Sequence, residues 1–292
     1  MMDQAISKAE ALSEALSYIQ RFHNKVVVVK VGGSIMDDEF ALSQILSDIV
    51  FMNYVGMQPV LVHGGGKAIN QAMETAGLKP QWVQGRRYTD ERTLAIAEHV
   101  LCNQINRFIV NFMQSQGCEA MGLHSLSSVV LFAEKTYLDG PDGRKIDLGL
   151  VGEVKSVNAR LLQLLVQADS IPCIATIARD PAGSRLNVNA DTAAGAVAAA
   201  MKAEKLVVVS DTHGIRMKAD DPDTRVSHLN VAQLDEMVKG GIITSGMLPK
   251  VEACIRALQG GVGKAHIIDG RIPHALLLEI YTEAGIGTEI VL

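Results

Sequence analysis

Aromatic residues, proline and clustered charge are scarce in this sequence. Of its 292 residues, 4% are aromatic, 20% are charged and 8 are prolines. Because 48% of the residues are hydrophobic, the chain has the composition of a folded protein and not of a disordered one. Its 26 glycines follow no strict period, which excludes a collagen-like chain. Apolar stretches such as 193–201 fall far short of the ~18 residues that span a membrane.

Basic residues form no block, and the cysteines form no metal-binding pair. The formal net charge is −5, which disfavours nucleic acid as a main partner because duplex binding needs clustered cations. The four cysteines are widely spaced with no CxxC pair, which predicts buried, reduced thiols in a cytoplasmic protein and no zinc site. The N-terminus is amphipathic and acidic, and it lacks the basic start and apolar run of a signal peptide.

Short apolar runs alternate with amphipathic segments along the chain. Strands are expected at residues 25–31, 59–62, 129–134, 171–175, 206–209 and 265–268. Helices are expected at residues 38–56, 90–116, 158–168, 190–203, 231–239, 248–260 and 273–283, with another ending near residue 77. A tight turn at 139–143 predicts a hairpin between about residues 128 and 157. The alternation predicts an α/β fold with a mainly parallel sheet covered on both faces, in two lobes that divide near residue 180.

A separate amphipathic helix is predicted at residues 5–22. Its apolar residues recur at steps of three and four, at Ile6, Ala9, Leu12, Leu16, Ile19 and Phe22. The helix precedes the first strand, so residues 1–24 form an extension outside the sheet. Two roles are open, because such a helix either packs on its own domain or covers another subunit.

Two predicted strands end in consecutive glycines that lead into a helix. They are VVVVKVGGS at residues 26–34 and PVLVHGGGKAIN at residues 59–70. Glycines let backbone amides approach a ligand, and a helix start carries partial positive charge, so both turns favour an anion. The spacing is not that of standard nucleotide motifs. A GxGxxG fingerprint from Gly64 would need glycine where the chain has Ile69, and both GK pairs are followed by alanine.

A few charged side chains stand at unusual places. Lys30 interrupts an apolar strand just before Gly32 and Gly33, which predicts a charged partner, and a lysine at the strand edge is the alternative. Lys250 lies near a helix start, where it opposes the helix dipole unless an anion binds there too. Asp191 opens an alanine-rich helix, either as a cap or as an acid that holds lysines. The chain shows no Ser-His-Asp order and no HExxH motif.

Arg87 and His63 are polar residues close to the glycine turns. Arg87 lies just before a helix that begins near Asp90, where its guanidinium either clamps a carboxylate or stays at the surface. His63 ends a strand, and we expect it to be a hydrogen-bonded structural residue.

Together and in this order, the motifs resemble the amino acid kinase family. The matching segments are VVVKVGGS, PVLVHGGGKAIN, GRRYTD, DLGLVGEV, LNVNADTAAG, KLVVVSDTHGI, GIITSGMLPKVEAC and HIIDGRIPHALLLEI. The resemblance implies an open αβα sandwich, with an acyl acceptor in the N-terminal lobe (25–180) and ATP in the C-terminal lobe (181–292). Within the family, the chain is most similar to members that phosphorylate the γ-carboxylate of N-acetyl-L-glutamate in arginine biosynthesis.

The resemblance also implies a role for each matching position. Lys30 and Lys250 match lysines that stabilise the transferring phosphoryl group, and Asp191 matches the aspartate that orients them. The acceptor is expected at Gly65, Gly66, Arg87 and Asn187. The nucleotide is expected at Gly32, Gly33, Asp211, Thr212, His213, Gly214, Ile215, Arg216, Ile242, Ile243 and Thr244. No protein metal site is implied, because Mg²⁺ would be held by the phosphates of ATP.

The N-terminal helix resembles the extension of arginine-inhibited members of the family. The resemblance implies a homo-oligomer, either a dimer or a hexamer in which the extension interlaces dimers. It also implies inhibition by L-arginine at a site that includes Tyr18, His274, Glu279 and Gly287.

The chain departs from the family pattern at three places. It has KVGGS in place of KYGGN or KYGGS, MGLHSLSSVV in place of a GLSGxDG-like segment, and Lys67 where proline commonly follows the triple glycine. One methylene is worth only about 1–3 kcal/mol of discrimination, so a kinase for a related N-blocked diacid such as N-acetylaminoadipate is an alternative. A catalytically weak, arginine-sensing homologue is another.

Overall fold

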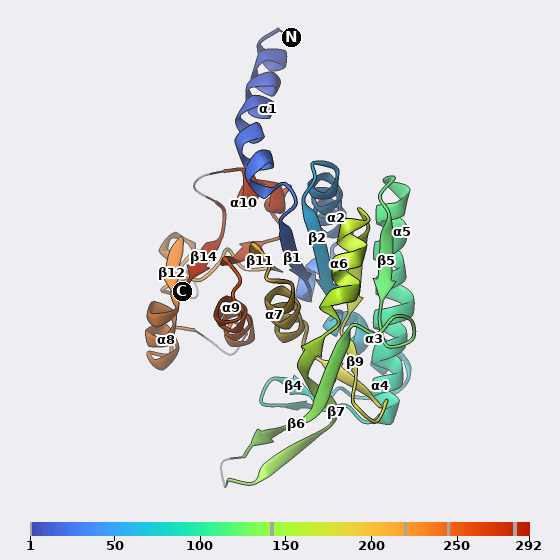
Figure 1. Cartoon of the computed structure of the whole chain (residues 1–292). Coiled ribbons are helices and arrows are strands. Elements are labelled where there is room, and N and C mark those ends of the chain that lie inside the picture. Colours follow the sequence, from blue (N-terminus) through green and yellow to red (C-terminus); the bar gives the residue numbers. More distant parts are fainter. Residues whose placement is uncertain (1, 141–142, 219–220, 244–245, 283–284) are drawn as a thin grey trace.

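The structure is a computed structural model that describes residues 2–140, 143–218, 221–243, 246–282 and 285–292. The described residues form an eight-stranded sheet (Figure 1). Its spatial order is β12 (His228–Asn230), β14 (Thr288–Val291), β13 (Lys264–Asp269), β11 (Lys205–Ser210), β1 (Val26–Val31), β2 (Gln58–His63), β8 (Ile171–Ala175) and β5 (Ala120–Leu123). The pairings are parallel except that of β13 with β14, which confirms the mainly parallel sheet.

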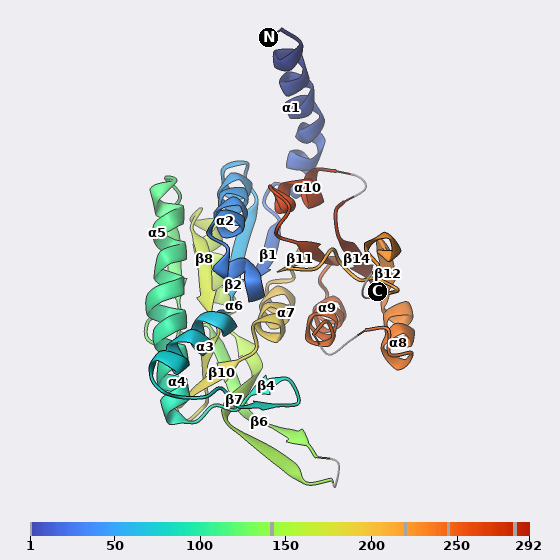
Figure 2. The same cartoon turned by 180° about the vertical axis from the view of Figure 1, so that it is seen from behind.

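Helices cover both faces of the sheet, as Figures 1 and 2 show from opposite sides. Val27, Val29 and Val31 face one core, with α2 (Glu39–Tyr54), α5 (Arg107–Ser115) and α10 (Ala275–Tyr281). Val28 faces the other, with α6 (Ala159–Gln167), α7 (Ala190–Met201), α8 (Val231–Lys239) and α9 (Leu248–Gln259). Because successive side chains of a strand point to opposite faces, a strand buried on both faces must be apolar throughout. This explains why β1 has valine at every position except Lys30, and the three-layer α/β arrangement is confirmed.

The long helix predicted at residues 90–116 is helical but not uniform. It comprises α4 (Glu91–Glu98), a π-helical segment η2 (His99–Asn106) and α5. The π segment turns Asn106 inward, where its amide donates to His63 Nε2 at 3.0 Å and to the Cys173 carbonyl at 2.9 Å. His63 is thus the hydrogen-bonded structural residue that the sequence predicted. A π segment often lies at a functional site, and this one packs its Ile105 side chain against Gly65.

A second set of strands lies beyond one end of the sheet. Four of the described strands close into a small barrel: β6 (Leu131–Asp139), β7 (Lys145–Val157), β9 (Ile177–Arg179) and β10 (Arg185–Val188). The β6–β7 pair is the predicted hairpin, and it extends away from the body (Figure 1). Beside it lies the short hairpin of β3 (Trp82–Val83) and β4 (Arg86–Arg87). Because β10 pairs with β7 and β9, the chain beyond residue 180 contributes to this barrel before α7 begins.

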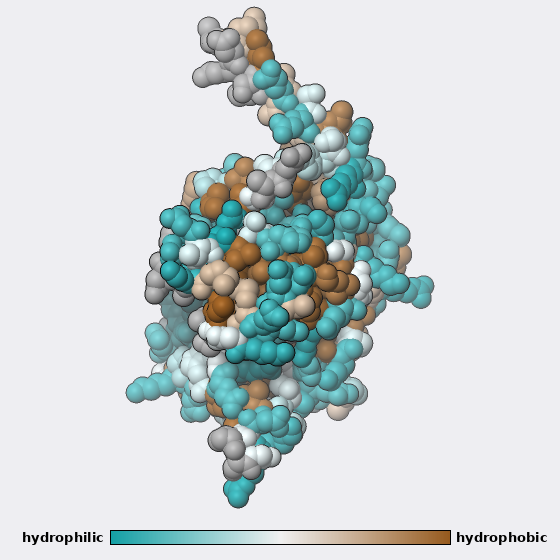
Figure 3. Space-filling model, turned by 90° about the vertical axis from the view of Figure 1, so that its left-hand side faces the viewer, coloured by the Kyte–Doolittle hydropathy of each residue, from teal (hydrophilic) through white to brown (hydrophobic). Residues whose placement is uncertain are grey.

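The first helix, α1 (Met2–Phe22), stands clear of the body (Figures 1 and 3). Its apolar residues Ile6, Leu12 and Leu16 are 48%, 69% and 52% exposed, and among the side chains of α1 that the structure describes only Phe22 is buried. The remaining helices are α3 (Gly66–Thr75) and the 3₁₀ turns η1 (Gly33–Asp37) and η3 (Pro222–Thr224). In the part of the chain described here, no helix has the length and apolarity to cross a membrane. The four cysteines are buried and free, as predicted.

Candidate active site

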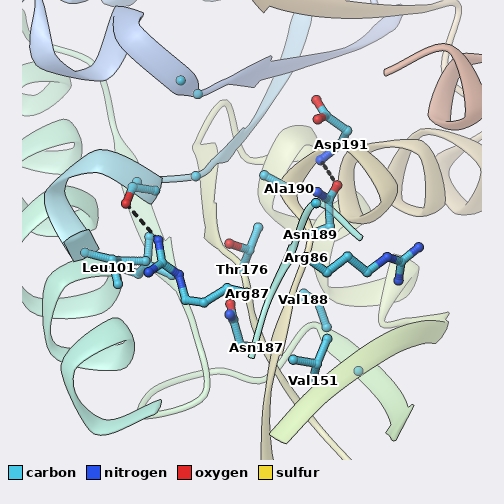
Figure 4. Close-up of a pocket in the computed structure, with 18 of the residues that line it drawn as sticks. Arg86, Arg87, Leu101, Val151, Thr176, Asn187, Val188, Asn189, Ala190 and Asp191 are labelled. Atoms are coloured by element: carbon cyan, nitrogen blue, oxygen red, sulfur yellow. Dashed lines mark hydrogen bonds between the residues drawn. The ribbon is translucent and has the colours of Figure 1, made fainter. Parts of the chain in front are cut away.

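The two glycine turns meet at the carboxyl end of the parallel sheet. β1 and β2 are neighbours in parallel register, so Gly32 and Gly33 come to lie beside Gly64, Gly65 and Gly66. The turns border a cavity of about 220 Å³, here called the acceptor cavity (Figure 4). Its other walls are Lys30, Ile69, Trp82, Gly85, Arg86, Arg87, Leu101, Val151, Gly152, Thr176 and 187–191. Ligands of open α/β sheets bind at this end of the strands.

Lys30 and Asp191 form a buried ion pair in this cavity. Lys30 Nζ lies 2.8 Å from Asp191 Oδ1, and the two residues are only 5% and 7% exposed. The cap of α7 is not Asp191 but Asn189, whose Oδ1 accepts from the backbone amides of Asp191 and Thr192 at 2.9 and 3.1 Å. The Asp191 carboxylate is therefore available to Lys30, which decides between the two roles that the sequence left open.

Lys250 adds a second ammonium from the first turn of α9. It is half-buried and donates to the Gly246 carbonyl at 3.0 Å. Burial lowers the pKa of Lys250, and the charge of Lys30 lowers it further, whereas Asp191 and Asp211 act to raise it. The structure therefore brings Lys30, Lys250 and Asp191 into one electrostatic group, although they come from three distant parts of the sequence.

Arg87 is a buried arginine held by groups of α3 and by an aromatic ring. Its Nη2 donates to the Gly66 carbonyl at 3.0 Å and to Asn70 Oδ1 at 2.5 Å, and its guanidinium lies 4.6 Å from the centre of the Trp82 ring. Burial lowers the pKa of Arg87. Asn187, also predicted, lines the same cavity and donates to Thr89 Oγ1 at 3.3 Å.

Steric space at the second glycine turn is limited. A Cβ added to Gly65 would lie 2.5 Å from Ile105 Cδ1 and 2.9 Å from Leu101 Cδ2, so a side chain there requires these two side chains to move. Gly65 and Gly66, for which acceptor binding was predicted, both line the acceptor cavity. A small cavity with backbone amides, a buried arginine and an asparagine suits a short, anionic, amide-bearing acid.

A second cavity of about 330 Å³ lies on the other side of the Lys30–Lys250 group. Its walls are Ser210, Asp211, Thr212, Gly214, Ile215, Arg216, Ile242, Ile243, Gly246, Met247 and Lys250. Seven of these were predicted to bind nucleotide. Of the other predicted positions, Gly32 and Gly33 line the acceptor cavity, His213 pairs with Asp269 at 3.0 Å, and Thr244 lies outside the described residues.

Ser34 connects the two sides of the site, and sequence reasoning missed it. Its hydroxyl donates to Asp211 Oδ2 at 2.6 Å, and this hydrogen bond lowers the pKa of Asp211. Asp211 is therefore an ionised carboxylate on the wall of the second cavity. The signal in the sequence was only the serine that ends the KVGGS segment.

A third cavity, of about 710 Å³, lies where α1 meets the body. Tyr18, Glu279 and Gly287 line it, together with Arg21, Phe22, Glu204, Lys205, Arg225, Ser227, His228, Lys264, His266, Ile280, Thr282, Gly285 and Glu289. Burial acts to raise the pKa of Glu279, but the hydrogen bond and charge of His266, the backbone amide of Ile286 and the charge of Lys205 together lower that pKa. His274 was predicted here but is not a wall residue, because its ring pairs with the buried Asp48 at 2.7 Å.

Comparisons of the whole chain with known proteins agree with one another. A model of the amino acid kinase family matches residues 25–269. The acetylglutamate kinase of Methanothrix thermoacetophila is 45% identical over 285 residues, 98% of this chain and 99% of that protein. The acetylglutamate kinase of Symbiobacterium thermophilum is 43% identical over 292 residues, the full length of both. That of Methanocaldococcus jannaschii is 46% identical over 293 residues, 99% of this chain and 98% of its own.

Solved structures share the fold at lower sequence identity. N-acetylglutamate synthase from Neisseria gonorrhoeae, complexed with coenzyme A and N-acetyl-glutamate, superposes with a TM-score of 0.85 at 23% identity. The match covers 97% of this chain and 63% of that one, so this chain spans less than two thirds of the synthase. Carbamate kinase from Giardia lamblia bound to AMP-PNP gives a TM-score of 0.64 at 16% identity, covering 92% of this chain and 98% of its own.

Proposed function

The chain belongs to the amino acid kinase family, and we propose that it is an acetylglutamate kinase. It transfers the γ-phosphoryl group of ATP to the γ-carboxylate of N-acetyl-L-glutamate, a step of arginine biosynthesis. The product is an acyl phosphate. The observation that carries the proposal is the buried Lys30–Asp191 pair, which together with Lys250 stands between two cavities.

The proposed roles follow from how these groups are placed. The acceptor carboxylate is already ionised at neutral pH, so its attack needs no general base. The remaining barrier is repulsion between that anion and the polyphosphate, which fixed cations and backbone amides reduce. Lys30 and Lys250 supply the cations, Asp191 orients them, and Arg87 with Asn187 holds the acetylglutamate. Because the segment 187–191 lines the acceptor cavity, the proposed lobes (25–180 and 181–292) share this wall.

ATP arrives as a complex with Mg²⁺ in this proposal. Among the described residues, no three His, Cys, Asp or Glu side chains are grouped to hold a metal ion. Mg²⁺ commonly binds through substrate phosphates and one or two carboxylates. The ionised Asp211 on the wall of the second cavity fits that donor set. The ion neutralises phosphate charge when ATP is bound.

L-arginine is proposed to inhibit the enzyme at the third cavity. Glu279 and Glu289 suit a guanidinium, while Lys205, Lys264 and Arg225 suit a carboxylate. Tyr18 lines the cavity from α1, so a ligand there would contact the extension directly. The cytoplasmic location stays a prediction.

Hydroxylamine trapping of the acyl phosphate tests the proposed function. Purified protein with MgATP should form hydroxamate fastest with N-acetyl-L-glutamate, when compared with glutamate, N-acetylaminoadipate, aspartate and carbamate. Faster turnover of N-acetylaminoadipate would replace the proposed substrate, and nucleotide binding without hydroxamate would indicate a non-catalytic homologue. Repeating the assay with L-arginine tests inhibition separately.

A further inference from the structure

Arg86 is a cation in the acceptor cavity to which the family motif assigns no role. It begins β4, opposite Val83, after a two-residue turn in which Gln84 and Gly85 have φ values of 47° and 77°. Two consecutive positive φ values are typical of the tight type I′ hairpin, which fixes the strand register. The backbone of Arg86 is thereby held at the cavity wall, while its long side chain keeps its own freedom.

Arg86 and Arg87 leave the strand in opposite directions (Figure 4). This is expected for successive residues of a strand. Arg87 points toward α3 and is bound there, whereas Arg86 extends on the side of the Asn189–Asp191 turn. Arg86 is half-buried and lines the cavity, yet it has no hydrogen-bond or ionic partner among the residues that the structure describes.

The charges of the protein at the point of transfer otherwise cancel. Lys30 is paired with Asp191 at 2.8 Å, and Lys250 interacts with Asp191 and Asp211. Two lysines and two aspartates carry no net charge. A phosphoryl group in transfer bears negative charge on its oxygens, and it lies next to an ionised carboxylate acceptor. These four side chains therefore provide no surplus positive charge for it, and Arg87, another cation of the cavity, is bound to groups of α3.

We propose that Arg86 is a further catalytic residue, which binds the oxygens of the phosphoryl group during transfer. In that step a γ-carboxylate oxygen of the acceptor forms a bond to the γ-phosphorus. The bond from that phosphorus to the β–γ bridging oxygen breaks, and its electron pair stays on ADP, so no proton moves. Arg86 contacts the phosphoryl oxygens only once the phosphoryl group reaches the acceptor cavity. This explains why its guanidinium has no partner before the transfer. The proposal rests on the proposed kinase function.

Kinetics of Arg86→Gln separate this role from simple substrate binding. We expect kcat to fall by about 10²-fold or more, with the KM values for N-acetyl-L-glutamate and ATP within about twofold of wild type. Arg86→Lys keeps the charge without the planar fork and should recover part of the loss. Lys79→Gln is the matched control, because it removes one exposed positive charge from the loop that leads into the same hairpin.

Binding of a transition-state mimic provides a second readout. In the presence of N-acetyl-L-glutamate, MgADP with aluminium fluoride should bind Arg86→Gln about 10²-fold more weakly than wild type, while MgAMP-PNP binds both equally. A raised KM for the acceptor with unchanged kcat would overturn the proposal and place Arg86 in ground-state binding. Equal kcat in both proteins would also overturn it. Absence of hydroxamate from the wild type would instead count against the kinase function itself.

Discussion

Buried charge in the acceptor cavity is compensated locally, and this determines what single substitutions do. Lys30 and Asp191 are each less than a tenth exposed, so removing one leaves the other as an unpaired buried charge. Lys250 is half-buried, and its ammonium donates to a backbone carbonyl. The two lysines therefore share a proposed chemical role but differ in their importance for stability.

Replacing either lysine with alanine is expected to remove most turnover while the protein still folds. Lys30→Ala should lower the free energy of unfolding by about 3–5 kcal/mol, because Asp191 loses its partner. Lys250→Ala should lower it by about 1 kcal/mol. Hydroxamate assays and urea denaturation measure the two effects, with Lys239→Ala at an exposed position of α8 as the control. Normal turnover in either variant would contradict the proposed role.

His63 gives the protein a pH-dependent stability. Its Nδ1–H donates to the Gly64 carbonyl at 3.2 Å while its Nε2 accepts from Asn106, an arrangement that requires the neutral ring. Burial lowers the pKa of His63 from 6.5 to about 4. The unfolded state therefore binds more protons between these values. The stabilisation is complete above pH 6.5 and is lost as the pH falls toward 4, by about 3 kcal/mol in total.

A substitution of His63 tests whether this residue makes the protein less stable as the pH falls. Because glutamine does not titrate, the free energy of unfolding of His63→Gln should fall less steeply than that of wild type between about pH 7 and about pH 4.5. Urea denaturation at several pH values measures the slopes. His99→Gln changes an exposed histidine and should keep the wild-type slope. Parallel curves for His63→Gln and wild type would contradict the assignment.

Sequence reasoning located site residues whose type was unusual for their place, and it missed those whose type was ordinary. Lys30 was found because a lysine in a valine strand needs a partner. Ser34 and Arg86 were given no role because serine is common in turns and arginine is common at the surface. Their contribution depends on which distant segment lies opposite, and the local sequence does not contain that information.

At the level of elements, α7 and α9 pack so closely that one position excludes a side chain. A Cβ added to Gly195 would lie 2.8 Å from the carbonyl oxygen of Ala253, which belongs to the rigid backbone of α9. The spacing of these two helices matters for the site, because α7 begins beside Asp191 and α9 carries Lys250. Close packing here therefore sets the separation of Asp191 and Lys250.

Gly195→Ala is expected to destabilise the protein, although alanine is the better helix former. Overpacking of this kind costs about 1–3 kcal/mol, which exceeds the gain of about 1 kcal/mol in helix propensity. Turnover should fall as well, because a wider helix pair moves Lys250 away from Asp191. Ala200→Ser adds one heavy atom at an exposed position of the same helix and serves as the control. A more stable Gly195→Ala protein would show that the helices separate without cost.

The elements that sequence patterns predicted are those with long, regular signals. The valine runs of β1 and β11 and the alanine-rich α7 were all expected. The strands β5, β9, β12 and β14 were not, because three or four residues carry too little periodicity to be recognised. The π segment η2 was also missed, since its contacts with Gly65 and His63 join segments that are distant in the sequence.

At the scale of the whole molecule, α1 has apolar residues that no other described part of the same chain covers. It projects from the body with Ile6, Leu12 and Leu16 exposed (Figure 3). Most helical stability in proteins comes from burial of an apolar face, which these exposed residues do not provide. The proposal that α1 packs against a second copy of the chain therefore follows from its own energetics. Because Tyr18 lines the third cavity, such packing would also affect the proposed arginine site.

Deleting residues 1–22 is expected to lower the mass in solution, measured by light scattering, and to weaken inhibition by L-arginine while uninhibited turnover persists. The reason is that the deletion removes the exposed apolar face of α1 together with Tyr18 and Phe22, but no residue of the acceptor or second cavity.

A double variant, Leu12→Asp with Leu16→Asp, should reproduce the change in mass with the chain otherwise intact. Ser13→Ala, at an exposed position between them, should leave the mass unchanged. An unchanged mass after deletion would place α1 on its own subunit, and loss of turnover would show that the helix supports the active site instead.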